Sequence, residues 1–203
     1  MPQVVAERCG IGPINAARAT EAAIARWRPR AVLVAGIAGG LQPDLAPGTT
    51  AVLDAVRTAD SRVRASPDLT DAVEDALRDA GTDARRGEGW TVDGVADAAA
   101  KRRLGTDGAL TVDSESGAVL DRAQVHGVPA AALRVVADPV ERGVPRSVVA
   151  LGWVDGATWW PNLLDLWRLP FEIGEVAQFR RDLRDGLKEL RCALPPALEA
   201  LTT

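Results

Sequence analysis

Apolar runs and amphipathic segments alternate along most of the chain, and this alternation predicts its strands and helices. Continuous apolar runs predict strands at 3–6, 31–35, 49–56, 109–112 and 130–136, since a strand covered on both faces needs no polar positions. Helical spacing predicts helices at 13–27, 70–80, 97–104 and 115–126, and a helical C-terminal tail over 161–194. The element order predicts an α/β fold: one domain, residues 1–203, with a central mixed, mostly parallel sheet flanked by helices.

Two glycine-rich segments punctuate the first two predicted strands. In Gly10-Ile-Gly12-Pro13, the proline suits the first helical turn, but Asn15 replaces the third glycine of the dinucleotide-binding fingerprint. A tight strand-to-helix connection is therefore the favoured interpretation, and a dinucleotide-binding oxidoreductase is disfavoured. Residues 36–40 contain three glycines and are expected to break the second strand, so that backbone N–H groups approach a ligand. A purely structural turn is the alternative.

Within the first predicted helix, the apolar side chains are expected to gather on one face. Ile14, Ala17, Ile24 and Trp27 have the helical spacing for this. Gly81 is expected to stop the helix at 70–80.

Composition narrows the function classes. The formal net charge of −4 gives no nucleic-acid-binding footprint, and no apolar run is long enough to span a bilayer. No signal peptide is recognised, and two cysteines give no disulfide framework, so the cytoplasm is expected. His126, the single histidine, precedes a glycine at a predicted helix end and is expected at the surface. A Ser-His-Asp triad and a histidine-based zinc site are thereby disfavoured.

The candidate chemistry lies in two acidic segments. Asp113 and Glu115 follow one predicted strand, and Asp138 follows the next, 23 residues after Glu115. Ligands of open α/β sheets bind at such strand ends. Two acids there suit a reaction that builds positive charge on a sugar and delivers a proton to a leaving group. The alternative is a helix N-cap and a surface turn.

A set of short motifs resembles the purine nucleoside phosphorylase and nucleosidase superfamily over essentially the whole chain. The motifs are Gly10-Ile-Gly-Pro-Ile-Asn-Ala-Ala, Ala35-Gly-Ile-Ala-Gly-Gly-Leu, Pro47-Gly48, Val112-Asp-Ser-Glu-Ser, Gly127-Val-Pro and Arg134-Val-Val-Ala-Asp138. Among subfamilies, the chain looks most like the hopanoid-associated phosphorylases, which act on adenosylhopane. It is also similar to methylthioadenosine/adenosylhomocysteine nucleosidases and, more distantly, to futalosine hydrolases.

The resemblance implies roles for both acids. Asp138 matches the general acid that protonates the purine leaving group at N7, and Glu115 matches the glutamate that holds the ribose hydroxyls and assists the developing oxocarbenium ion. Asp113 would support Glu115, and Ser114 would lie against the sugar. The remaining positions matched to the base and sugar site are Gly36, Ile37, Ala38, Gly39 and Val92. No metal or cofactor is implied, although phosphate is a possible co-substrate.

Departures from the family pattern bear on the nucleophile. Relatives carry a further strand and helix before the segment matching Gln3, including, in nucleosidases, an acid that helps activate water. Val34 occupies the position of a phosphate-binding arginine in trimeric phosphorylases, and Ile37 replaces a hydroxyl residue. Because the side chains of Val34 and Ile37 cannot bind phosphate, hydrolysis is favoured over phosphorolysis.

The tail is rich in aromatic residues. Six lie within 27 residues: Trp153, Trp159, Trp160, Trp167, Phe171 and Phe179. They could line a channel for a large apolar substituent, form a subunit interface, or pack terminal helices on the core.

Together, these observations predict an enzyme that cleaves the N-glycosidic bond of an adenine nucleoside with a large, adenosylhopane-like 5′ substituent. The substrate is lipid-linked in that case, although no membrane span is predicted, and a homo-oligomer is expected from the family. The alternatives are a methylthioadenosine/adenosylhomocysteine-type nucleosidase and a non-catalytic nucleoside-binding paralogue.

Overall fold

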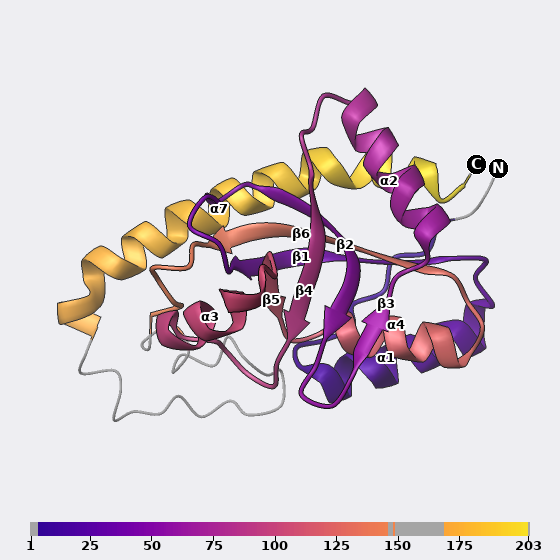
Figure 1. Ribbon diagram of the computed structural model, residues 1–203, viewed down its shortest axis with the longest axis horizontal. Coiled ribbons are helices and arrows are strands. Elements are labelled where there is room, and N and C mark those ends of the chain that lie inside the picture. Colours follow the sequence, from indigo (N-terminus) through magenta and orange to yellow (C-terminus); the bar gives the residue numbers. More distant parts are fainter. Residues whose placement is uncertain (1–3, 146–147, 149–168, 203) are drawn as a thin grey trace.

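The computed structural model describes residues 4–145, 148 and 169–202, and these form a central sheet with helices on both faces (Figure 1). The strands are β1 (Val32–Gly40), β2 (Thr50–Arg57), β3 (Arg62–Arg64), β4 (Arg85–Thr91), β5 (Thr111–Asp113) and β6 (Ala130–Asp138). The helices are α1 (Pro13–Trp27), α2 (Pro67–Asp79), α3 (Ala98–Leu104), α4 (Ser116–Val125) and α7 (Leu169–Ala200), with a 3-10 turn, η1, at Gly105–Asp107. The α/β class and the helical C-terminal segment are confirmed.

The sheet is mixed and its strand order is β3-β2-β4-β5-β1-β6. Because β6 also pairs with β2, five strands close into a ring. Three pairings are parallel (β1–β6, β2–β4 and β4–β5), and three are antiparallel (β1–β5, β2–β3 and β2–β6). The register places Gly39 of β1 opposite Val112 of β5 and Asp138 of β6. The two acidic segments of the sequence therefore meet across β1.

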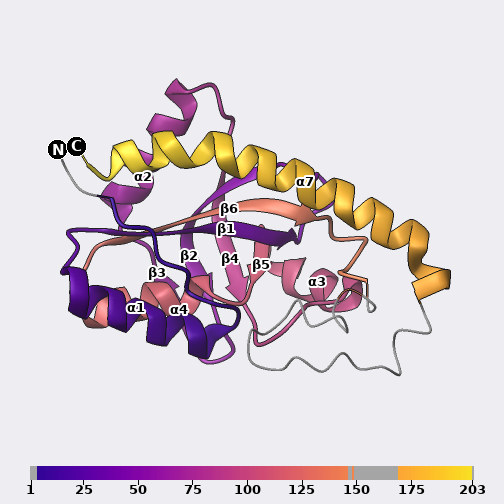
Figure 2. The same cartoon turned by 180° about the vertical axis from the view of Figure 1, so that it is seen from behind.

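Helices cover the two faces of the sheet as separate pairs (Figures 1 and 2). On one face, α1 and α4 pack over a cluster that includes Val34, Leu120 and Val136. On the other, α2 and α7 pack over a cluster that includes Leu77 and Leu133. Burial on both faces explains why β2 and β6 have near-continuous apolar sequences.

Helix boundaries follow the expected signals. Pro13 is the first residue of α1, after Gly12 at φ 90°, and the helix ends at Arg28 (φ 45°), which precedes a proline. Gly81, at φ 82°, follows α2 as predicted.

The predicted apolar face of α1 is wrong at two of its four positions. Ile14 is 72% exposed and Trp27 41% exposed, whereas Ile24 is buried. The buried face runs through Ala16 and Thr20 instead, and the small Ala16 lets α1 lie close against α4.

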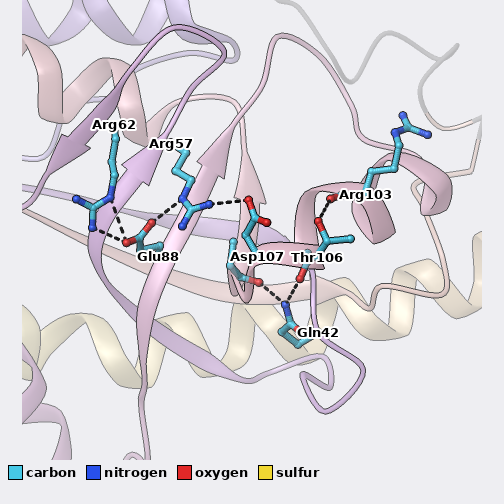
Figure 3. Close-up of polar contacts among 9 residues, drawn as sticks. Gln42, Arg57, Arg62, Glu88, Arg103, Thr106 and Asp107 are labelled. Carbon is cyan, nitrogen blue, oxygen red and sulfur yellow. Dashed lines mark hydrogen bonds and ion pairs between the residues drawn. The ribbon is translucent and has the colours of Figure 1, made fainter.

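Two strand predictions need correction, and two strands, the short β3 and β4, were not predicted. Residues 4–6 form no strand, and Gly36–Gly40 continue β1 instead of breaking it. The strand β4 was not predicted, because its sequence Arg-Arg-Gly-Glu-Gly-Trp-Thr lacks an apolar pattern. Its polar side chains are paired across the sheet. The Glu88 carboxylate accepts from Arg57 Nε (2.6 Å) and from Arg62, which lowers the pKa of Glu88 to about 2 (Figure 3).

Candidate active site

A cleft of about 360 Å³ lies where β1, β5 and β6 meet, which is a volume typical of small-molecule sites. All nine residues predicted for the site line this cleft: Gly36, Ile37, Ala38, Gly39, Val92, Asp113, Ser114, Glu115 and Asp138. The structure thus brings them together, while their individual roles stay predictions. A second hollow of about 440 Å³, at the start of β2, contains none of them.

Asp113 is a structural anchor at the end of β5. Its Oδ1 accepts hydrogen bonds from Thr91 Oγ1 (2.8 Å) and from the backbone N–H groups of Glu115 and Ser116 (both 2.9 Å). The two backbone bonds tie the start of α4, whose N-cap residue is Glu115, to the end of β5. Asp113 is therefore not itself the N-cap, but its bonds explain how the chain turns sharply enough to present Glu115.

Glu115 lies at the N-terminus of α4 and faces the cleft. Its Oε1 accepts a hydrogen bond from the backbone N–H of Gly12 (3.1 Å), at the N-terminus of α1, where the helix dipole favours a negative charge. Its Oε2 lies 3.8 Å from Arg134 Nη2. The Gly10–Gly12 segment leads into α1, but no strand precedes it in residues 4–9, so it is not the strand-to-helix connection that was favoured. It instead holds an acid of the cleft.

Arg134 is a residue that sequence reasoning missed. It is 3% exposed on β6, and its Nε lies 2.9 Å from Asp113 Oδ2 and donates to Ser116 Oγ (2.8 Å). The buried Nη2 makes no hydrogen bond to the described residues. A charged residue inside the apolar run 130–136 was the available signal, because a buried arginine requires carboxylate partners.

Asp138 ends β6 and is 7% exposed, with its carboxylate Oδ2 paired to Lys101 Nζ from α3. Burial raises the pKa of Asp138, and the Lys101 ammonium opposes that rise. Burial also lowers the pKa of Lys101, against the effect of Asp138. Each member of the pair is therefore pushed towards its neutral form by the loss of water.

Apolar side chains form much of the remaining wall. Val92, Val95, Val144 and Phe179 line the cleft, and Phe179 comes from α7. The side chain of Phe179 packs against Ala137 beside Asp138. The tryptophans at 153, 159, 160 and 167 lie outside the described residues, as does the side chain of the aromatic residue at 171. The three interpretations of the aromatic tail thus stay predictions for those positions.

The structure places the two residues that depart from the family's phosphate-binding pattern, Val34 and Ile37. Val34 is packed in the core between the sheet and α1, so it does not line the cleft, whereas Ile37 does. His126 is exposed at the end of α4, as predicted, and Cys9 and Cys192 are free thiols. Within 4–145, 148 and 169–202, no group of three or more His, Cys, Asp or Glu residues is arranged to hold a metal ion.

The sequence profile of the phosphorylase superfamily matches residues 2–150. The chain belongs to this superfamily. The predicted resemblance is confirmed at that level, and membership makes the protein an enzyme of the phosphorylase and nucleosidase type. The similarity to its hopanoid-associated members stays a prediction. No curated protein sequence matches the chain.

Solved structures share the fold. A candidate methylthioadenosine nucleosidase from Weissella paramesenteroides is 26% identical, with a TM-score of 0.61 over 71% of this chain and 73% of its own. The methylthioadenosine/adenosylhomocysteine nucleosidase of Neisseria meningitidis, in complex with methylthio-immucillin-A, has a TM-score of 0.69 at 17% identity, covering 94% and 78%. Futalosine hydrolase of Helicobacter pylori has a TM-score of 0.65 at 17% identity, covering 92% and 76%.

Proposed function

We propose that the protein cleaves the N-glycosidic bond of an adenine nucleoside and releases adenine, with water as the attacking group. The observation that carries this proposal is the meeting of Glu115 and Asp138 in one cleft, in different surroundings. Glu115 lies beside a helix N-terminus and an arginine, where a negative charge is stabilised. Asp138 is buried, which favours the protonated carboxyl that a general acid needs.

In this mechanism, Asp138 donates its proton to N7 of the purine while the bond between C1′ and N9 breaks. The bonding electrons leave with the base, which departs as neutral adenine, and positive charge develops on the ribosyl group. The Glu115 carboxylate holds the ribose hydroxyls and stabilises that charge, more strongly in the transition state than in the ground state. Water adds to C1′ and loses a proton, and Asp138 is reprotonated from solvent.

The charges around the cleft support water over phosphate. Two cations, Arg134 and Lys101, face three carboxylates, Asp113, Glu115 and Asp138. Because both cations are already paired with carboxylates, neither offers an unpaired positive charge to a phosphate dianion.

We further propose that the 5′ substituent is apolar and large, as in adenosylhopane. The apolar lining by Ile11, Ile37, Val144, Val148 and Phe179 supports this. A cleft of about 360 Å³ accommodates the nucleoside, so a hopane-sized group would extend beyond it. A methylthio group is the small-substituent alternative. Two free thiols fit the expected cytoplasmic location, and homo-oligomerisation stays a prediction.

The test is adenine release, followed by chromatography, from adenosine, methylthioadenosine and adenosylhopane, each with and without phosphate. We expect release that does not depend on phosphate, and the preferred substrate identifies the substituent. Asp138→Asn should lower turnover by about two to four orders of magnitude, while Asp60→Asn, at an exposed loop position, should leave it unchanged. A ribose-1-phosphate product would refute hydrolysis, and near wild-type turnover of Asp138→Asn would refute the acid assignment.

A binding protein without turnover is the second candidate. The ion pair between Lys101 and Asp138 favours it, because an ammonium stabilises the carboxylate over the acid. Tight nucleoside binding, measured by calorimetry, with no adenine release from any of the three substrates would support this candidate.

A further inference from the structure

The chain carries a lysine in the wall of the cleft that the proposed reaction does not yet use. Only two of its 24 basic residues are lysines, Lys101 and Lys188. Lys188 is exposed on α7, whereas Lys101 is 1% exposed and lines the cleft. A buried lysine costs stability unless its charge is paired and its protons are hydrogen-bonded.

Four oxygen atoms surround the Lys101 ammonium. Its Nζ donates to the carbonyl oxygens of Asp138 (3.2 Å), Pro139 (3.2 Å) and Arg142 (2.9 Å), and to the Asp138 carboxylate. Every partner is an acceptor and the group carries three protons, so the surroundings fit an ammonium ion. A compact point charge fits this cage better than the planar fork of an arginine, in a chain that otherwise uses arginine almost throughout.

Strand β1 leaves space for the Lys101 side chain at Gly39. A Cβ atom on Gly39 of β1 would lie 2.7 Å from Lys101 Cε and 3.0 Å from Nζ. The absence of a side chain at Gly39 therefore lets Lys101 cross β1 and reach the end of β6.

The ion pair between Lys101 and Asp138 leaves one carboxylate oxygen of Asp138 for a substrate. Lys101 holds Oδ2 of Asp138, while Oδ1 makes no hydrogen bond to any residue that the structure describes. Because Asp138 lines the cleft and its Oδ2 is held by Lys101, Oδ1 is the oxygen left to meet a base there. Lys101 thus fixes the orientation of the carboxyl group through Oδ2.

Other charged groups also act on Asp138. Asp182 of α7 raises its pKa, and Arg142, in the turn after β6, lowers it. These two groups form their own ion pair at 2.9 Å, and Glu141 of the same turn interacts with Lys101. Since the Arg142 and Asp182 effects oppose each other, Lys101 is the main charge that counteracts the burial of Asp138.

We propose that Lys101 is a positioning residue for the general acid: its ammonium aims Asp138 at the base and sets the upper pH limit of turnover. This inference rests on the proposed function, in which the protonated form of Asp138 is the active one. A nearby cation favours the carboxylate, so turnover falls at a lower pH with Lys101 present than it would without it.

The first experiment is the pH dependence of kcat for adenine release. In Lys101→Met and Lys101→Gln, we expect the alkaline fall in kcat to move to higher pH by about one unit or more, since an opposite charge at contact distance shifts a carboxyl by that amount. Loss of orientation should also lower the plateau of kcat by about tenfold or more. Lys101→Arg keeps the charge and should keep the alkaline limb, and Lys188→Met is the matched control. Superimposable limbs in the wild type and both neutral variants would overturn the proposal.

The second experiment needs no turnover. In protein labelled with ¹³C-aspartate, the Asp138 carboxyl signal is identified by its loss in Asp138→Asn, and its titration midpoint is measured by NMR. The midpoint should be higher in Lys101→Met than in the wild type, and an equal midpoint would overturn the inference even if adenine is released. A raised midpoint without adenine release would refute the proposed function and leave the control of Asp138 by Lys101 standing.

Discussion

Asp113→Asn separates the support of the site from its chemistry. Oδ1 of Asp113 accepts three hydrogen bonds, and Oδ2 pairs with Arg134 Nε at 2.9 Å, in a side chain that is only 2% exposed. Asparagine keeps the shape and one acceptor oxygen, but it places either an NH₂ group against the arginine or an uncharged oxygen there. The substitution therefore breaks a buried ion pair and leaves the other charge in place.

The loss of unfolding free energy in Asp113→Asn depends on the partners that Arg134 keeps. Removing one partner of a buried pair costs about 3–5 kcal/mol. Arg134 still has Glu115 at 3.8 Å, so we expect the lower end, about 3 kcal/mol. For a chain of this size, 1 kcal/mol corresponds to roughly 2–4 °C, so the Tm should fall by roughly 6–12 °C.

Glu115→Gln provides the contrast. The longer distance to Arg134 makes Glu115 a weaker partner, and a glutamine oxygen can still accept from Gly12 N–H. We expect a stability loss of less than about 1 kcal/mol, because the side chain is partly solvated. Turnover should nevertheless fall by about a hundredfold or more, because the charge facing the ribosyl cation is gone.

Urea unfolding followed by tryptophan fluorescence gives the free energies, and adenine release gives the turnover. We expect Asp113→Asn to be the less stable of the two variants, and Glu115→Gln to keep its stability but turn over slowly. The buried ion pair does not hold the site together if the unfolding free energy of Asp113→Asn lies within about 1 kcal/mol of the wild-type value. The same conclusion follows if Glu115→Gln is the less stable of the two variants.

Three further substitutions test the surroundings. Gly36→Ala places a Cβ 2.5 Å from Arg134 Nη1, so it should cost about 1–3 kcal/mol in urea unfolding and lower adenine release as the arginine shifts. Because two arginines depress the pKa of Glu88 to about 2, its stabilisation is present above the unfolded value of about 4.3 and disappears as the pH falls towards 2. The stability gap between wild type and Glu88→Gln should thus be about 1 kcal/mol at pH 7 and close by pH 2, and a constant gap would contradict it. Gln42→Ala removes hydrogen bonds to the backbone carbonyls of Gly105 (2.8 Å) and Ala109 (2.7 Å) (Figure 3), and should lower the unfolding free energy by about 1–2 kcal/mol. An unchanged urea midpoint would show that water replaces these bonds.

Local sequence signals predicted the helices and the buried strands well. The runs at 49–56 and 130–136 became β2 and β6, since burial on both faces leaves an uninterrupted apolar sequence. The strand β4 escaped prediction because ion pairs, and not apolar contacts, satisfy its side chains. Glu88 there binds arginines from β2 and β3, and such pairing depends on register that no local pattern contains.

The acids of the site could be located from the sequence, and their cations could not. Asp113, Glu115 and Asp138 follow predicted strands, so strand ends alone suggested that they meet. Lys101 lies on a short helix 37 positions before its partner Asp138, and only the fold brings the two together. Arg134 was overlooked because it stands within an apolar run, although a charge at a buried position always needs a partner.

The glycines of β1 connect these observations. They were expected to expose backbone N–H groups to a ligand, but the structure places them within a strand, beneath two long cationic side chains. Gly36 makes room for Arg134, and Gly39 makes room for Lys101. Each cation in turn holds one acid region of the cleft, Asp113 with Glu115 in the first case and Asp138 in the second. A Cβ atom added at Gly36 would meet a guanidinium nitrogen of Arg134, and one added at Gly39 would meet the side chain of Lys101. A larger residue at either position would therefore displace a charged group of the cleft. The small residues of β1 therefore help to position the carboxylates of the cleft through the two cations that hold them.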